Sequence, residues 1–130
     1  NKEGNPIIKI GNRIRVEIDP SSHSEIVALR MACRDVQSRY LEGFTLYSTH
    51  SPCMMCFGAC IWAKVGRIVY GVYQRDIAKY GKIHGNEKYK WRALDIEPEE
   101  LYRYARKAHP GMEIIGGFMR DECLKLFHSD

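Results

Sequence analysis

The feature that most constrains the fold is an uncharged stretch of 21 residues, 43–63. Its length raises the question of a membrane-spanning helix, which needs about 20 consecutive apolar residues. However, polar residues 48–51 and Pro52 interrupt the stretch near its centre, so it cannot form one continuous apolar helix. We therefore expect a strand over residues 44–49, a loop, and a helix over residues 53–65 that Gly66 ends.

The rest of the chain alternates between strand and helix patterns. Apolar residues at spacings of 3, 4, 3 and 4 between Ile26 and Tyr40 predict a helix with one buried face. We also expect a strand or hairpin over residues 1–19, strands over 67–72 and 112–115, and helices over 97–108 and 118–127. The link between the last two strands contains a helix, which predicts that these strands run parallel. This alternation predicts an α/β sheet with helices on both faces, and 130 residues suit one domain.

Composition narrows the chemistry. Five cysteines, an odd number, and the absence of a secretory signal pattern favour thiols or metal ligands in a cytoplasmic protein that is not in a membrane. The net charge of +4 is modest, but residues 64–92 carry eight basic and two acidic side chains. Tyrosines and a tryptophan are interleaved with these charges, which suits a nucleic-acid surface. We interpret the segment first as a solvated charged face.

Two short motifs stand at predicted helix starts. Cys53 and Cys56, spaced i and i+3, lie on one face of a first helical turn and can bind one metal ion. The helix N-terminus favours their thiolate forms. With neutral His23 as a third ligand, two thiolates balance the charge of Zn²⁺ and leave a fourth position for an activated water. Glu25, two residues beyond His23, would be close enough to move protons without binding the ion.

Each motif has a structural alternative. Residues 22–25 also form an S-x-x-E capping box, in which Glu25 bonds back to the helix start. Ser51 and Pro52 are a good cap for the second helix, and a Cys-x-x-Cys after a strand also describes a thioredoxin-like redox centre. A non-catalytic domain stabilised by zinc is a further possibility. Taken together, however, the motifs match the H-x-E…P-C-x-x-C pattern of zinc nucleobase deaminases.

Four blocks of sequence extend this match across most of the chain. Residues 19–30, DPSSHSEIVALR, and 46–59, LYSTHSPCMMCFGA, resemble the two metal blocks of the cytidine deaminase superfamily, in its guanine deaminase and tRNA adenosine deaminase branch. Residues 67–71, RIVYG, and the Gly-Gly followed by Asp-Glu-Cys in 116–123 resemble its later blocks. The resemblance implies a three-layer α/β/α fold with a central mixed sheet. It also implies one Zn²⁺ held by His23, Cys53 and Cys56, with Glu25 as the catalytic residue.

The resemblance further suggests residues that contact substrate. Asn12 lies where family members place an asparagine that bonds the base or sugar, and Trp62 could line the pocket wall, although core packing is the favoured interpretation of this tryptophan. A backbone N–H near Ser24 could hold the leaving group or a substrate oxygen. The remaining cysteines, at apolar helical positions, are interpreted as small core residues: Cys33, Cys60 and Cys123.

The expected function is hydrolytic deamination of a free purine-type base such as guanine, with release of ammonia. The acidic start of the helix at residues 97–108 favours a small substrate over a nucleic-acid backbone. The alternatives are tRNA adenosine deamination and cytosine deamination, the latter because Ser51 replaces the usual glutamate as in fungal cytosine deaminases. A homodimer is expected by analogy. The family's N-terminal helix and first strand have no counterpart before Asn1, which predicts an exposed sheet edge and an incomplete pocket.

Overall fold

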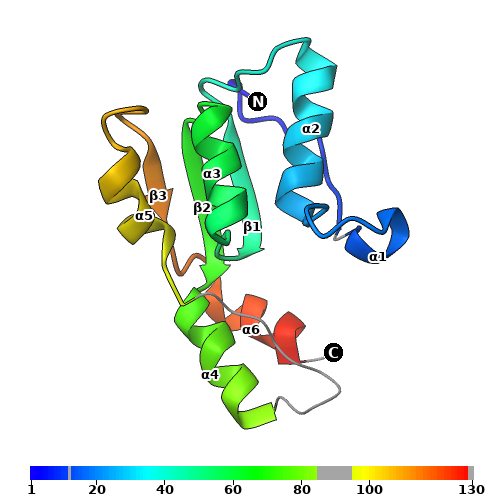
Figure 1. The fold of residues 1–130 in the computed structure, drawn as a ribbon, viewed down its shortest axis with the longest axis vertical. Coiled ribbons are helices and arrows are strands. Elements are labelled where there is room, and N and C mark those ends of the chain that lie inside the picture. The colour runs from blue at the N-terminus through cyan, green and yellow to red at the C-terminus, as the bar shows by residue number, and fades with distance from the viewer. Residues whose placement is uncertain (12, 85–94, 129–130) are drawn as a thin grey trace.

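The computed structural model describes residues 1–11, 13–84 and 95–128 of the chain (Figure 1). No helix in these ranges is long and apolar enough to cross a membrane. The described elements follow in the order α1 (Ile14–Glu17), α2 (Ser24–Val36), β1 (Thr45–His50), α3 (Met54–Trp62), β2 (Arg67–Val72), α4 (Gln74–His84), α5 (Pro98–Ala105), β3 (Glu113–Ile115) and α6 (Arg120–His128).

The sheet has the strand order β1-β2-β3 (Figure 1). Val69 at the centre of β2 is in register with Tyr47 on β1 and with Ile115 on β3, and both pairings are parallel. The prediction that the last two strands run parallel is thus confirmed. The described strands form a purely parallel sheet rather than the expected mixed one, and the described part of the N-terminal segment adds no strand to it.

The main core lies between the sheet and the helices α2, α3 and α5. Ile68 and Tyr70 of β2 are almost fully buried there, against Leu29 of α2 and Phe57 and Cys60 of α3. Leu101, Tyr102 and Ala105 of α5 pack against the same cluster. The three helices therefore form one layer on the face of the sheet where the candidate metal ligands lie. Tyr47 on β1, at one edge of the sheet, is by contrast 68% exposed.

The helix α6 forms a second helical layer and packs against β2 at Gly71. Successive side chains of a strand point to opposite faces, so position 71 faces away from the core side occupied by Tyr70. A Cβ added to Gly71 would collide with the side chain of Cys123 on α6. Glycine at this position therefore allows the close approach of α6, and the three-layer α/β class is confirmed.

The predicted strand over residues 1–19 is wrong. Ile7 and Ile8 pack against the core from an extended segment without strand pairing, and the chain then turns into α1. Val16 and Ile18 are 70% and 91% exposed, so their alternation does not reflect burial. A local ion pair of 3.1 Å between Arg13 and Glu17 closes the helical turn instead. Without a neighbouring strand to bond its backbone, an alternating sequence has no reason to stay extended.

The helix α4 was not expected from the sequence. Ile77 and Tyr80 are half-buried, while Arg75, Lys79 and Lys82 are exposed on the other side. The spacing of the apolar residues, four from Tyr73 to Ile77 and three from there to Tyr80, is helical. Because basic and aromatic residues are frequent in this segment, its helical spacing was not recognised from the sequence. The part of the expected basic surface over residues 85–92 lies outside the described residues.

Candidate active site

Two helix N-termini bring the predicted ligands together. His23 is the N-cap residue of α2, Cys53 is the N-cap residue of α3, and Cys56 lies in the first turn of α3. His23 Nδ1 is 3.8 Å from Cys53 Sγ and 3.6 Å from Cys56 Sγ, and the two sulfurs are 3.7 Å apart. His23 thus converges on one point with two cysteines that follow it 30 and 33 residues later.

The spacing of these three atoms fits a tetrahedral zinc ion. Zn–S bonds of about 2.3 Å and a Zn–N bond of about 2.1 Å would separate two sulfurs by about 3.8 Å, and a sulfur from a nitrogen by about 3.6 Å. The observed separations differ from these values by about 0.2 Å or less. Two thiolates and one imidazole are also the donor types of catalytic zinc sites, which keep a fourth position for water or substrate.

Hydrogen bonds within the cluster prepare one thiolate. The sulfurs of Cys53 and Cys56 share a hydrogen bond of 3.7 Å, and the backbone N–H groups of Cys56 and Met55 also bond to the Cys53 sulfur. Together with the nearby His23 they lower the pKa of Cys53 to about 5. The same hydrogen bond raises the pKa of the Cys56 thiol, with burial and the charge of Glu25 adding to the effect. The site therefore favours the thiolate form of Cys53, the form in which a cysteine binds a metal.

The carboxylate of Glu25 faces this cluster. Its Oε2 is 3.4 Å from Cys56 Sγ, and its Oε1 accepts a hydrogen bond of 2.8 Å from the hydroxyl of Ser48 on β1. The N-cap of α2 is His23 and makes no side-chain capping bond. The hydroxyl of Ser22 donates to Glu17 instead. The contacts of Glu25 therefore differ from those of the capping box, and its carboxylate is available to the site.

Ser48 is a site residue that the sequence analysis missed. It lies two positions after Leu46, which packs against the core, so both side chains point to the helix-covered face of the sheet. A hydroxyl at a core-facing strand position needs a hydrogen-bond partner. That reasoning could have identified Ser48 as a polar neighbour of the site, although not that its partner is Glu25.

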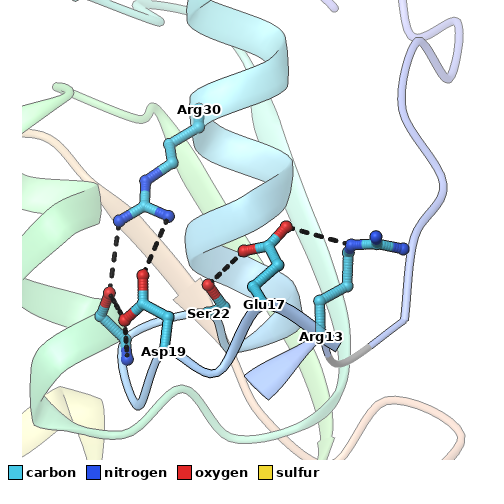
Figure 2. Close-up of polar contacts among 6 residues, drawn as sticks. Arg13, Glu17, Asp19, Ser22 and Arg30 are labelled. Atoms are coloured by element: carbon cyan, nitrogen blue, oxygen red, sulfur yellow. Dashed lines mark hydrogen bonds and ion pairs between the residues drawn. The ribbon is translucent and has the colours of Figure 1, made fainter. Parts of the chain in front are cut away.

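The loop before His23 is held by a network of hydrogen bonds and ion pairs near the start of α2 (Figure 2). Asp19 accepts bonds of 2.8 and 2.7 Å from the backbone N–H and the hydroxyl of Ser21. Arg30 of α2 reaches back to both residues, at 3.3 Å from the Ser21 hydroxyl and 3.9 Å from the Asp19 carboxylate. Arg13 is ion-paired to Glu17, which also accepts the Ser22 hydroxyl bond (Figure 2). These short-range contacts fix the entry of the chain into α2.

The loop before Cys53 is held from β2 and α4. The Ser51 N–H donates to the Val72 carbonyl at 2.7 Å, and the Ser51 carbonyl accepts a bond of 2.7 Å from the side chain of Gln74. Cys53, rather than Ser51, is the N-cap residue of α3. The expected cap role of Ser51 is therefore wrong, because its backbone is bound to the start of α4 rather than to α3.

A cavity of about 500 Å³ lies beside Glu25, between α2, β1 and the N-terminal segment. Ser24, Glu25, Ser48 and Thr49 form a polar part of its wall, and most of the remaining lining is apolar. His23, Cys53 and Cys56 do not line it. The predicted substrate contact Ser24 thus borders a space that can admit a small molecule.

Trp62, another predicted substrate contact, does not reach this space. Trp62 is 82% exposed at the last turn of α3, the end of the helix opposite to the cysteines, and it does not line the cavity. Core packing of Trp62, the favoured interpretation, is therefore wrong, because α3 turns this position outward, whereas its role as a substrate contact stays a prediction. Asn12 lies outside the described residues. Of the three remaining cysteines, Cys60 is fully buried in the core, and Cys33 and Cys123 are half-buried.

Comparison with known proteins places the chain in a family. The family described as MafB19-like deaminase matches residues 2–122. The chain belongs to this family. The match confirms the predicted deaminase superfamily and, at the level of the family, the predicted enzyme class of hydrolases that act on C–N bonds.

Two relatives of this MafB19-like deaminase are named for different substrates. The tRNA-specific adenosine deaminase of Aquifex aeolicus is 30% identical over 106 residues, which cover 74% of this chain and 68% of the relative. The guanine deaminase of Bacillus subtilis is 30% identical over 99 residues, which cover 76% of this chain and 62% of the relative. The matched segments thus span about two thirds of each relative's length.

A solved structure agrees with the fold. A chain from a study of A-to-I editing by tRNA:A34 deaminases superimposes with a TM-score of 0.72 at 26% identity, and the match covers 95% of this chain and 78% of that one.

Proposed function

We propose that the chain is a zinc-dependent hydrolase that removes an amino group from a nucleobase, replacing it with a carbonyl oxygen from water and releasing ammonia. The observation that carries this proposal is the convergence of His23, Cys53 and Cys56 at tetrahedral spacing, with the Glu25 carboxylate 3.4 Å from one ligand sulfur. Zn²⁺ bound there would supply an activated water as the nucleophile. The residues of the chain must then move protons and hold the substrate.

In the proposed mechanism, Glu25 moves the protons. Its carboxylate takes a proton from the attacking water as oxygen bonds to the ring carbon that bears the amino group. Glu25 gives this proton to the ring nitrogen, then takes the remaining proton from the hydroxyl now on the ring carbon and gives it to the amino group. The C–N bond then breaks with ammonia as the leaving group, and the oxygen becomes the product carbonyl. The hydrogen bond from Ser48 holds Oε1, which leaves Oε2 directed at the metal cluster. We propose that Ser24, which lines the cavity, contacts the base.

A free purine-type base is the proposed substrate, and the similarity to the guanine deaminase supports it. The acidic start of α5 gives less support than the sequence implied. The Glu97 carboxylate accepts backbone N–H bonds from α4, and Glu99 accepts a bond of 2.6 Å from the hydroxyl of Tyr70. Two of the three carboxylates therefore serve internal contacts rather than repelling a nucleic-acid backbone.

The second candidate substrate is an adenosine within tRNA. Similarity to the tRNA-specific adenosine deaminase of Aquifex aeolicus and to the tRNA:A34 deaminase structure supports this candidate. The exposed basic residues of α4 offer positive charge to a phosphate backbone. The homodimer expected by analogy stays a prediction for either substrate.

Ammonia release from a panel of substrates tests the proposal. The panel contains guanine, adenine, cytosine, an aminated triazine and a tRNA anticodon stem-loop, each with zinc-loaded protein. Release from guanine or another purine base alone supports the first candidate, and release from the stem-loop alone supports the second. Release from no substrate by protein with one zinc per chain contradicts catalysis and favours a zinc-stabilised scaffold.

A further inference from the structure

The loop that carries Cys53 is bound to the start of α4 by a buried side chain. Gln74 is 3% exposed, and its Nε2 donates to the Ser51 carbonyl at 2.7 Å. Ser51 is itself 3% exposed, and its N–H bonds to Val72. Both backbone groups of Ser51 are therefore held, one by the last residue of β2 and the other by the first residue of α4.

Gln74 is in turn held by a buried carboxylate. Glu97, at the N-cap of α5, accepts hydrogen bonds of 3.2 Å from the backbone N–H of Gln74 and 3.0 Å from that of Arg75. The side chain of Glu97 comes from 23 residues further along the chain, yet the residue is only 9% exposed. A carboxylate on the first N–H groups of a helix is a favourable, charge-assisted contact. It fixes the position of Gln74 relative to α5.

The next residue after Ser51 transmits this constraint to the metal ligand. Pro52 has a ring that fixes its φ angle, so the orientation of the Ser51 carbonyl largely determines where Cys53 begins. Pro52 is also fully buried, which leaves the loop little room to move. A change in the Ser51–Gln74 bond would therefore shift the Cys53 sulfur relative to His23 and Cys56.

We propose that Gln74 is a positioning residue for the metal-binding loop, and that Glu97 secures it. This inference rests on the proposed zinc ligation. It connects the segment between β2 and β3, which contains α4 and α5, to the geometry of the metal centre. Substitution of residues that orient metal ligands without binding the metal commonly lowers metal affinity by 10- to 100-fold. The chain therefore uses a buried amide, rather than a contact to the ligand itself, to hold Cys53 in place.

The test replaces Gln74 by methionine, which has a similar length and no hydrogen-bonding amide. The variant Gln74→Met leaves the Ser51 carbonyl without its donor, and we expect Zn²⁺ affinity, measured by competition with a chromophoric chelator, to fall by about tenfold. The variant Glu97→Gln keeps one acceptor oxygen and should lower the affinity less. The matched control is Gln37→Met: the amide of Gln37 also donates to a backbone carbonyl at 2.7 Å, but it is exposed at the end of α2.

The visible spectrum of the Co²⁺-substituted protein separates positioning from general stability. A displaced Cys53 thiolate changes the ligand-field and charge-transfer bands, whereas a loss of stability alone lowers the melting temperature and leaves the bands unchanged. We expect altered bands in Gln74→Met and wild-type bands in Gln37→Met. Wild-type affinity and bands in Gln74→Met would overturn this inference alone. A wild-type protein that binds no Zn²⁺ would contradict the proposed function and the inference together.

Discussion

The two loops that carry the candidate ligands are held in different ways. The loop before His23 is fixed by partners close in the sequence, and its ion pair between Arg30 and Asp19 has side chains 46% and 38% exposed. The loop before Cys53 is fixed by Val72 and Gln74, which are buried and come from elements that follow α3. Exposed ion pairs contribute little to stability, whereas unpaired buried polar groups are costly.

The two loops also differ in how far apart along the sequence their contacting residues lie. Each contact of the network before His23 joins residues within 11 positions of one another. The contacts around Ser51 span 21 and 23 positions. The candidate metal site thus joins a locally determined loop to one that depends on the rest of the fold. Substitutions in the two loops should therefore have unequal effects, and the following predictions run from the largest to the smallest.

The largest effect is expected at Glu25, between the two loops. Glu25→Ala should retain Zn²⁺ and lower kcat by about 10²- to 10⁴-fold, because general acid–base catalysis supplies a factor of that size. Ammonia release and metal content, measured on the same sample, check this prediction. The exposed Glu42→Ala is the control and should behave as wild type. Comparable turnover in wild type and Glu25→Ala would remove Glu25 as the proton carrier.

Ser48 should matter through the orientation of Glu25. Ser48→Ala removes a hydrogen bond to a carboxylate, worth about 1.5 kcal/mol, so kcat should fall by about tenfold. Ser48→Thr keeps the hydroxyl and should restore most of the activity. KM should change little in either variant, because Ser48 contacts Glu25 and is assigned no direct contact with the base. An equal loss in both variants would show that the position matters for packing rather than for the hydrogen bond.

Asp76 gives a test of a contact on α4 that lies away from the metal. Its carboxylate accepts a bidentate bond from Arg120 of α6 and another from the N–H of Tyr73. The Arg120 hydrogen bond is the main cause of the lowered pKa of Asp76. Asp76→Asn should lower the free energy of unfolding at pH 7 by about 1 kcal/mol, without altering Zn²⁺ affinity.

The pH dependence of this contribution has a definite sign. Because the pKa of Asp76 is lower in the folded state than the ordinary value of 3.8, the stabilisation is fully present above pH 3.8. It is lost as the pH falls below 3.8 through the folded-state pKa. The difference in unfolding free energy between wild type and Asp76→Asn, followed by urea titration, should therefore shrink below pH 4. A difference that grows with acidification would contradict the ion pair.

The smallest effect is expected at Arg30, in the exposed network of Figure 2. Arg30→Ala should leave Zn²⁺ affinity unchanged and should lower the melting temperature less than Asp76→Asn does, because solvent screens its contacts. Metal competition and thermal unfolding at two salt concentrations check this. A loss of Zn²⁺ affinity as large as that expected for Gln74→Met would contradict the difference between the two loops, because an exposed contact would then matter as much as a buried one.

The sequence was sufficient where the pattern itself determines the neighbours. The 3.6-residue period predicted α2, although this helix ends at Val36 rather than at Tyr40. The uncharged strand–loop–helix over β1 and α3 and the apolar strand β2 were predicted nearly to their ends. The spacing of Cys53 and Cys56 fixes their relative position once α3 forms. His23 could be added because the motif as a whole, rather than any single spacing, matches a known zinc site.

The sequence was insufficient where distant contacts decide. The alternation from Ile14 to Ile18 predicted a strand, but a strand needs a partner for its backbone, and the local ion pair of Arg13 formed a helical turn instead. Trp62 is an aromatic residue of the kind that often lines a pocket, yet its side chain is exposed on the surface. Gln74 and Ser48 carry no motif, and their roles follow only from the packing of the elements on which they lie.

The zinc content of four proteins tests the central claim most directly. Wild type, His23→Ala, Cys53→Ala and Cys56→Ala are purified in parallel, and bound metal per chain is measured by mass spectrometry of the metal. If the two loops share one tetrahedral ion, wild type holds one Zn²⁺ and each variant loses most of it, with a lower melting temperature because ligation and folding are coupled. Zn²⁺ retained at full occupancy in any of the three variants would contradict the ligand set.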